Sequence, residues 1–316
     1  METTPATFLH DGTIGDVWAA IPAMRTYWEK TGRKIILYLT KDRPAEYYFG
    51  SDHPTKEDGK MVMLNQKMID MMRPLLKAQS FISDVLPREV DAQEPRIMID
   101  LNMIRMTNIG MPNGSINRWY FQVLPDMSRD LTKPWLEVPD TGIDYATDKI
   151  LINRTERYLN PNLDYGFLRD YQDECVFMGT MREYTSFTTN FDLEIEKVNV
   201  NNFLEFAQAV KQCRFYIGNQ SQGYQLAQGI FKRSMLEYSF LAQNVMPVGP
   251  EMYDYCQQLG MEWHFHALNG TTPVFLEKLA RQPIPQPEPM LAKDAEKEIE
   301  QWETDQVQDE EEKTAP

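Results

Sequence analysis

Apolar residues along the chain follow two alternating patterns, short continuous runs and longer stretches with helical spacing. The continuous runs have the length of strands in a parallel sheet, and the run at 34–39 predicts a strand covered on both faces. Polar or glycine-containing turns follow most of them. Together these runs predict strands near residues 7–10, 34–39, 96–101, 134–138, 149–153, 175–179 and 215–221.

The stretches between the runs are amphipathic. The first places Val17, Met24 and Trp28 on one helical face, which predicts a helix lying on the sheet. Pro22 kinks this helix or marks its first turn, and Pro74 leaves open whether the second stretch forms one helix or two. The predicted helices cover about residues 16–31, 64–81, 117–124, 203–212 and 224–230.

Strands alternate with helices in both halves of the chain. This predicts an α/β fold of two Rossmann-like, doubly wound domains whose strand ends face each other across one cleft. A length of 316 residues fits two domains of ordinary size. We expect a first domain at 1–142, a second at 143–282, and a proline-rich linker with an acidic tail at 283–316.

Charge and composition exclude several classes of protein. The net charge of −15 argues against bulk nucleic-acid binding. Eleven acids against three lysines after residue 285 place −8 of this charge in the tail, which is a solvated segment or a docking segment. No window is apolar enough to span a membrane, and three scattered cysteines fit a reducing compartment, so we expect a cytoplasmic protein.

The turn Gly12-Thr13-Ile14-Gly15-Asp16 follows the first predicted strand. Glycine at positions 12 and 15 lets a ligand approach the backbone, and Asp16 stands at the start of a helix. A carboxylate there is able to act as a general base towards a substrate hydroxyl. The alternative is an ordinary acid that stabilises the helix terminus.

Two further segments end strands of the second half. Arg154 and Arg157 follow the run at 149–153, where guanidinium groups are able to hold a diphosphate. Gly218, Asn219, Gln220 and Ser221 lie between a strand and a helix and offer amides and polar side chains to a phosphate or sugar. Surface arginines and a simple capping turn are the alternatives.

Familiar cofactor and metal motifs are absent from the sequence. It contains neither a P-loop nor a G-x-G-x-x-G fingerprint, and no G-x-S-x-G elbow accompanies Ser221. The histidines form no zinc pattern with the cysteines, and His264-x-His266 is typical of one face of a strand. We therefore expect no metal site and no cofactor. Without a D-x-D pair, a sugar transferase of this sequence would be metal-independent.

The turn at 12–17, with Ile21-Pro22-Ala23-Met24 after it, resembles the opening motif of the ADP-heptose lipopolysaccharide heptosyltransferases, which have the two-domain GT-B fold. The chain is still more similar to a poorly characterised bacterial and phage family of heptosyltransferase-like proteins. The matching blocks keep their order between about residues 7 and 245. They are Pro74-Leu75 to Ile82, Pro134-Trp135-Leu136, Ile152 to Tyr158, Phe177-Met178-Gly179 with Glu183, and Ile217 to Ser221.

The resemblance implies roles for several residues. Asp16 matches the catalytic base, Glu183 the acid near the donor nucleoside, and Arg154 and Arg157 the region that binds the donor diphosphate. The block that resembles Asn-Asp-Ser-Gly-x-x-His carries Gln220 in place of the acid and Gln225 in place of the histidine.

Two hypotheses about function follow. The first is an inverting glycosyltransferase that moves a sugar from a nucleotide-diphosphate donor to a hydroxyl acceptor such as a glycan, with Asp16 as base and the second domain holding the donor. The alternative, motivated by Gln220 and Gln225, is a non-catalytic GT-B protein that binds a nucleotide, a glycan or a protein.

Overall fold

The structure, a computed structural model, describes residues 4–45, 56–57, 60–106, 114–124, 127, 131–140, 142–240 and 243–272. The chain divides into two units, Met1–Thr271 and Thr272–Pro316, and the fold described below is that of the first. The predicted linker and acidic tail at 283–316 lie outside the described residues. Within those residues, no helix is long and apolar enough to cross a membrane.

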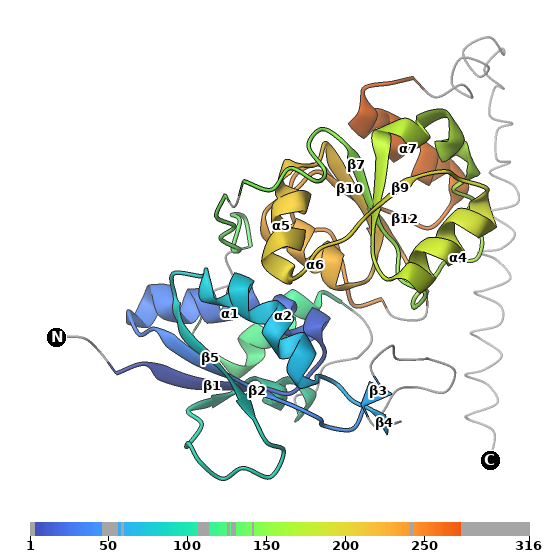
Figure 1. Ribbon diagram of the computed structural model, residues 1–316. Coiled ribbons are helices and arrows are strands. Elements are labelled where there is room, and N and C mark those ends of the chain that lie inside the picture. The colour runs from blue at the N-terminus through green and yellow to red at the C-terminus, as the bar shows by residue number, and fades with distance from the viewer. Residues whose placement is uncertain are drawn as a thin grey trace, which may run out of the picture. The chain divides into compact units, whose positions relative to one another are not determined.

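A four-stranded parallel sheet forms from the first part of the chain, with strand order β5-β2-β1-β6. Helices α1 and α2 lie together on one face of it (Figure 1). Its elements, with a small separate hairpin β3-β4, are β1 (Ala6–His10), α1 (Ile14–Thr31), β2 (Ile35–Thr40), β3 (Lys56–Glu57), β4 (Lys60–Met61), α2 (Gln66–Lys77), β5 (Ile82–Arg88) and β6 (Ile99–Asp100).

Among the described residues, helices cover the first sheet on one face. Residues 89–98, which connect β5 to β6, contain no helix. Burial accordingly alternates along β2, where Ile35, Leu37 and Leu39 are buried and the two side chains between them are half-buried. The prediction that this strand is covered on both faces is therefore wrong, because alternation is the pattern of a sheet with one packed face.

A six-stranded parallel sheet forms from the second part, with strand order β12-β11-β10-β7-β8-β9. Helices α5 and α6 cover one face, and α4 and α7 the other (Figure 1). Strands β7, β8, β10 and β11 are buried along their whole length. The elements are β7 (Ile150–Asn153), η3 (Gly166–Glu174), β8 (Cys175–Met178), α4 (Met181–Phe191), β9 (Glu196–Val198), α5 (Phe203–Gln212), β10 (Phe215–Asn219), α6 (Gln222–Gly229), β11 (Ser234–Glu237), β12 (Met252–Tyr255) and α7 (Gln258–Asn269).

Three short helical segments join the two sheets in sequence: η1 (Leu101–Met106), α3 (Ile116–Trp119) and η2 (Tyr120–Val123). The predicted strand at 134–138 is wrong. This stretch is extended, but Trp135 and Leu136 both donate their N–H groups to the carbonyl of Gly229 at the end of α6 instead of pairing with a strand. The strand predicted at 96–101 shrinks to two residues because the chain turns into η1.

One apolar cluster continues from the helix-covered face of the first sheet to one face of the second. It contains Ile21 of α1 and Leu75 of α2 together with Phe206 of α5 and Leu226 of α6. Trp18 meets Phe203 edge to face, with ring centroids 5.6 Å apart. The other face of the second sheet has its own cluster, centred on Phe177, Phe215 and Phe265. The two α/β halves thus share a core along α1, α2, α5 and α6.

Candidate functional site

The strand orders place a topological switch point in each sheet, where chain connections leave in opposite directions. In the second sheet the strands run 3-2-1-4-5-6 in their own sequence order, and the switch lies between β7 and β10. In the first sheet it lies between β1 and β6. Open α/β sheets bind ligands outside the carboxyl ends of strands at such points. Most of the predicted site residues follow β1, β7 or β10.

At each switch point, an asparagine side chain forms hydrogen bonds with the backbone of the neighbouring loop. At the first, the Asp11 N–H donates to Oδ1 of Asn102 at 3.0 Å. At the second, Oδ1 of Asn219 accepts from the N–H of Thr155 at 3.1 Å, and its amide nitrogen donates to the carbonyls of Thr155 and Arg157 at 2.8 and 2.7 Å. The predicted phosphate-binding side chain of Asn219 is therefore used to hold the loop after β7.

Asp16 is the third residue of α1 and caps its own helix. Its Oδ2 accepts from both the N–H and the hydroxyl of Thr13 at 2.8 Å, and Nη2 of Arg105 lies 3.7 Å away. Each of these contacts uses Oδ2. The capping alternative is thus realised in the structure, and Oδ1 is the oxygen that remains for an acceptor hydroxyl.

His10 stabilises this turn through hydrogen bonds. Its Nδ1 accepts the N–H of Gly12 at 2.9 Å, so Nε2 carries the proton and donates to the Tyr120 hydroxyl at 2.8 Å. Burial lowers the pKa of His10 to about 4, against the opposing influence of Asp16. Burial also raises the pKa of Tyr120 well above its ordinary value. Both groups are neutral near pH 7 and fix the turn that carries Asp16.

The second sheet repeats the turn of the first. Gly179-Thr180-Met181-Arg182-Glu183 has the glycine, threonine and acid at the same spacing as 12–16, and Glu183 accepts from the N–H and hydroxyl of Thr180 at 2.8 and 2.9 Å. A Cβ at Gly12 would stand 2.8 Å from Asp16 Oδ2, and one at Gly179 would stand 3.0 Å from Glu183 Oε2. Both glycines make room for the capping acid.

Glu183 is partly buried beside charged neighbours. Burial raises the pKa of its carboxyl, while the bonds from Thr180 and the nearby Arg157 act in the opposite direction. Glu183 is therefore within electrostatic reach of Arg157. The structure brings these two predicted donor-side residues into one neighbourhood.

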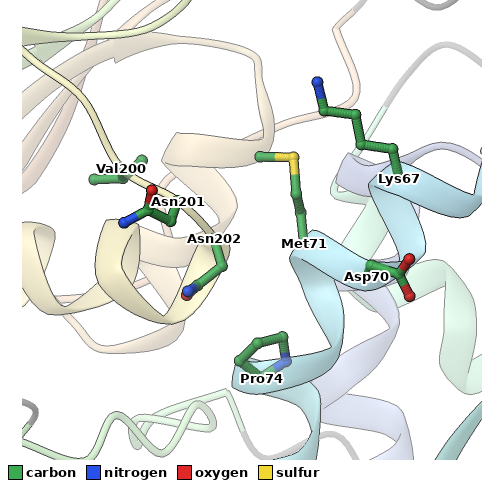
Figure 2. Close-up of a pocket in the computed structure, with 7 residues that line it drawn as sticks. All are labelled: Lys67, Asp70, Met71, Pro74, Val200, Asn201 and Asn202. Carbon is green, nitrogen blue, oxygen red and sulfur yellow. The ribbon is translucent and has the colours of Figure 1, made fainter.

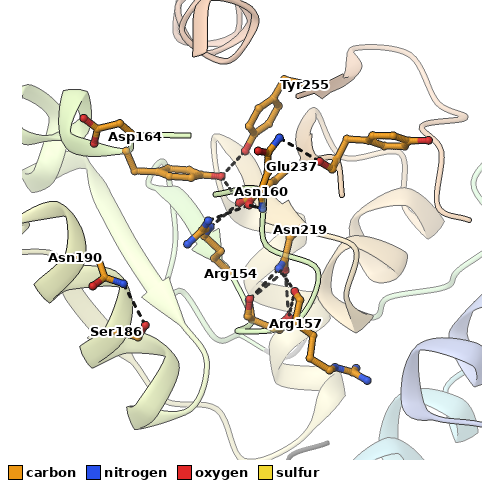
Figure 3. A network of polar contacts seen from close by, with 12 residues as sticks. Arg154, Arg157, Asn160, Asp164, Ser186, Asn190, Asn219, Glu237 and Tyr255 are labelled. Carbon is orange, nitrogen blue, oxygen red and sulfur yellow. Dashed lines mark hydrogen bonds and ion pairs between the residues drawn. The ribbon is translucent and has the colours of Figure 1, made fainter. Parts of the chain in front are cut away.

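Arg154 belongs to a buried network and not to a surface loop. Its Nε and Nη2 donate to the two carboxylate oxygens of Glu237 at 2.5 and 2.9 Å (Figure 3). Glu237 also accepts from the Asn160 N–H at 2.6 Å and from the Tyr165 hydroxyl at 2.8 Å. Arg154 is 8% exposed and Glu237 is 0% exposed. Burial is the largest single influence and acts to lower the pKa of Arg154, but the hydrogen bonds to Glu237 and the charge interactions with Glu237, Tyr165 and Tyr255 together outweigh it, so this pKa is raised.

Arg157 differs from Arg154 in its surroundings. Its backbone carbonyl is held by Asn219, while its side chain leaves the buried network (Figure 3). The guanidinium lies 5.4 Å from the centre of the Tyr158 ring. Of the two arginines predicted to hold a diphosphate, Arg154 is committed to Glu237 and Arg157 projects from the switch point.

The first turn of α6 lacks a cap from its own N-cap side chain. Ser221 donates its hydroxyl to Asn153 at 3.2 Å instead of accepting from the helix. Gly15 of α1 lies opposite, because a Cβ there would stand 3.9 Å from the Gln222 nitrogen. Helix N-terminal amides that point outward bind anions. The beginnings of α1 and α6 therefore meet at the place where an anion is favoured.

Gly218 and Gln220 have packing roles at the same edge. A Cβ at Gly218 would stand 2.5 Å from the Tyr216 hydroxyl, so this glycine fits the side chain of Tyr216. Oε1 of Gln220 accepts the N–H of Ser239 at 3.0 Å and so joins the ends of β10 and β11. Gln225 accepts a hydrogen bond from Nδ2 of Asn117 at 3.0 Å, which ties α6 to α3.

Two of the surface hollows among the described residues are considered, and neither is lined by a predicted site residue. The larger, about 780 Å³, lies between α2 and the segment that enters α5 (Figure 2). Its polar groups are used locally, since Asn202 caps α5 and Asp70 accepts from Arg73. The smaller hollow, about 380 Å³, lies beside β6, η1 and η2. No cluster of metal ligands occurs among the described residues.

The sequence patterns misplaced two histidines and missed three residues of the site. His264 and His266 lie on α7, not on a strand as predicted, and His264 stacks on Tyr253 with ring centroids 4.6 Å apart. Glu237, Tyr120 and Arg105 come from segments that no apolar run or helical spacing had indicated as functional. Glu237 could have been predicted as a candidate, because it is a charged residue directly after the apolar pair Met235-Leu236.

The fold is shared with known heptosyltransferases. Similar solved structures include ADP-heptose LPS heptosyltransferase II of E. coli, 10% identical, with a TM-score of 0.55 over 84% of this chain and 98% of that one. E. coli heptosyltransferase WaaC with ADP-2-deoxy-2-fluoro heptose is 9% identical, with a TM-score of 0.52 over 87% of this chain and 99% of that one. No protein-family profile and no curated protein matches the sequence. The predicted two-sheet α/β fold, that of the GT-B heptosyltransferases, is confirmed.

Proposed function

We propose that this protein is a glycosyltransferase that moves a sugar from a nucleotide-diphosphate donor to a hydroxyl acceptor. The observation that carries the proposal is the meeting of α1 and α6 at Gly15 and Gln222. It sets amides suited to a diphosphate beside the turn that holds Asp16. Its fold, which solved sugar transferases share, supports the same conclusion.

The donor diphosphate lies at the first turn of α6 in this proposal. Arg157 supplies the positive charge, and Glu183 lies on the side of the nucleoside, as the resemblance implies. Arg154 contributes indirectly: together with Asn219 it fixes the loop from which Arg157 projects. Gly12, Gly179 and Gly218 act through packing, whereas Gly15 leaves space in front of Gln222.

The reaction uses Asp16 as base. The acceptor oxygen bonds to the anomeric carbon as its proton passes to Oδ1 of Asp16. The bond from that carbon to the diphosphate breaks, and the amides of α6 and Arg157 stabilise the negative charge that the diphosphate gains. Direct attack inverts the anomeric centre, and the step requires no metal ion.

Nucleotide binding tests the first half of the proposal. We expect one of ADP, UDP, GDP or CDP to raise the melting temperature of the wild type. Gly15→Ala fills the space before Gln222 and should weaken that nucleotide at least tenfold. Gly260→Ala, also in the first turn of a helix but with open space around its Cβ, is the matched control. A wild type that binds no nucleotide would overturn the proposal.

The chemical step is tested with Asp16→Asn, which keeps a capping oxygen and removes the base. Release of nucleoside diphosphate from a panel of nucleotide sugars should fall about 10² to 10⁴-fold, with nucleotide affinity unchanged. Equal turnover in the variant would refute the assigned base.

The second candidate function is a non-catalytic nucleotide-binding or glycan-binding protein of the same fold. The observation in its favour is that helix capping alone accounts for both Asp16 and Glu183. Tight nucleotide binding without turnover of any nucleotide sugar would establish it in place of the transferase.

A further inference from the structure

The segment that follows β11 lies next to the beginning of α6. In the register of β10 with β11, Asn219 lies opposite Glu237. Two residues after Glu237, the Ser239 N–H donates to Oε1 of Gln220 at 3.0 Å. Gln220 directly precedes Ser221, the N-cap of α6. The residues after β11 are therefore neighbours of the helix turn at which the proposed diphosphate binds.

Two aromatic side chains occur in this segment. Tyr238 is half-buried and Phe240 is 58% exposed, and their rings meet edge to face with centroids 6.3 Å apart. Phenylalanine is among the residues that are most often buried. Here its ring is exposed at the carboxyl end of a parallel sheet, which is the edge where open α/β sheets bind ligands.

The alternation of side chains along β11 gives the direction of the Phe240 ring. Met235 packs in the cluster on the outer face of the second sheet, and Leu236 packs in the cluster that the two sheets share. Continuing the alternation places Tyr238 and Phe240 on the same side as Leu236. The contact between the two rings agrees with this placement. Phe240 is therefore on the side of the sheet that joins the first half of the protein.

The chain after Phe240 leads to the first half. The Asn244 carbonyl accepts the N–H of Ile116, the first residue of α3, at 2.8 Å. Gly15 of α1 stands opposite the Gln222 nitrogen, as described above. A ligand at the first turn of α6 is therefore flanked by the start of α1 and by the segment that carries Phe240.

The strand order indicates which part of a donor is directed towards Phe240. In the second sheet, β11 and β8 lie on opposite sides of the pair β10-β7. Glu183, in the first turn of α4 after β8, is on the nucleoside side in the proposed function. A nucleotide sugar carries its nucleoside and its sugar at opposite ends of the diphosphate. The end directed towards β11 is then the sugar.

We propose that Phe240 packs against the C–H face of the sugar that the protein transfers, with Tyr238 holding the ring of Phe240 edge to face. This assignment rests on the proposed function, and it adds a residue that binds the sugar. One face of a hexopyranose presents several C–H groups, which bury apolar surface when they lie on an aromatic ring. The nucleoside and the diphosphate make no contact with Phe240.

Calorimetric titration of the full chain separates binding of the sugar from binding of the nucleotide. ADP-glucose, UDP-glucose, UDP-galactose and GDP-mannose are compared first, and the nucleotide sugar that binds most tightly is paired with its own nucleoside diphosphate. Phe240→Ala should weaken the nucleotide sugar about tenfold, because the apolar burial against the ring is lost. Its affinity for the nucleoside diphosphate should be unchanged. Phe240→Tyr keeps the ring and should bind both compounds as the wild type does.

Tyr145→Ala is the matched control. Tyr145 is 40% exposed and precedes β7, at the opposite, amino edge of the same sheet, so its loss should change neither affinity. No loss in Phe240→Ala, or an equal loss of both compounds, would overturn the assignment of Phe240 to the sugar. A wild type that binds neither compound would refute the proposed function itself, so the two failures are distinguishable.

Discussion

The two arginines near β7 lead to opposite predictions. Arg154→Met removes two of the four hydrogen bonds to Glu237 and leaves a fully buried carboxylate without its counter-charge. Breaking a buried ion pair from one side costs about 3–5 kcal/mol, so the free energy of unfolding should fall by that amount. Arg157→Met, outside the Glu237 network, should lower the free energy of unfolding less than Arg154→Met does, and it should weaken nucleotide binding.

Urea titrations followed by circular dichroism measure the stability of both variants, and calorimetric titration with the nucleotide measures affinity. A double variant, Arg154→Met with Glu237→Gln, removes both charges. It keeps one acceptor oxygen for the Asn160 N–H, and the new amide nitrogen is able to donate to the Tyr165 hydroxyl, so it should recover much of the lost stability. The reasoning is refuted if Arg154→Met costs less than about 1 kcal/mol, or if it abolishes nucleotide binding in a protein of normal stability.

Three further predictions concern the turns and the buried histidine. Gly12→Ala forces its Cβ to within 2.7 Å of His10 and 2.8 Å of Asp16, so it should destabilise by about 1–3 kcal/mol in urea titrations, more than Gly15→Ala. Glu183→Gln should cost about 0.3–1 kcal/mol, because a neutral cap loses its interaction with the helix dipole. His10 has a pKa of about 4 when folded and about 6.5 when unfolded, so the unfolded state binds the extra proton between these values. The free energy of unfolding should therefore be fully present above pH 6.5 and fall by on the order of 3 kcal/mol towards pH 4, a slope that His10→Gln should flatten.

The sequence predicted those elements whose apolar pattern is strong. The segment 203–212 is helical over its full predicted length, and the strand ends at His10 and Asn153 lie where the runs placed them. Strand β10 ends at Asn219, two residues before the predicted end at 221. Pro74 does not divide α2, which continues through it. The five-residue run at 134–138 failed as a strand because the N–H groups of Trp135 and Leu136 are taken by Gly229 at the end of α6 and that of Glu137 by the side chain of Gln79, contacts far away in sequence.

Elements with mixed polarity were missed. Strand β5 carries Ser83, Asp84 and Pro87, and β12 carries Asp254 between two tyrosines, so neither shows a continuous apolar run. The role of Arg154 could not be predicted without β11, because Glu237 lies 83 residues away in sequence. Residue identity shows that a group is able to bind phosphate, whereas its actual partner depends on which strands are neighbours.

The repeated capping turn explains why local sequence was ambiguous at the candidate base. Thr13 with Asp16 and Thr180 with Glu183 have the same spacing and the same hydrogen bonds. Helix capping therefore explains the presence of both acids without a catalytic role. Only the surroundings, with Arg105 near Asp16 and Arg157 near Glu183, distinguish the two acids.

The hydrogen bond between Asn117 and Gln225 has a consequence for how the two halves of the protein respond to acid. Nδ2 of Asn117 also lies 3.4 Å from the carbonyl of Ala19, so this amide bridges α1 and α6. An amide pair has no proton to gain or lose near neutral pH. The similar heptosyltransferase motif has a histidine in place of Gln225, and a histidine would become charged below about pH 6.5. The junction between the two sheets is therefore held by a contact whose strength is constant across the physiological pH range.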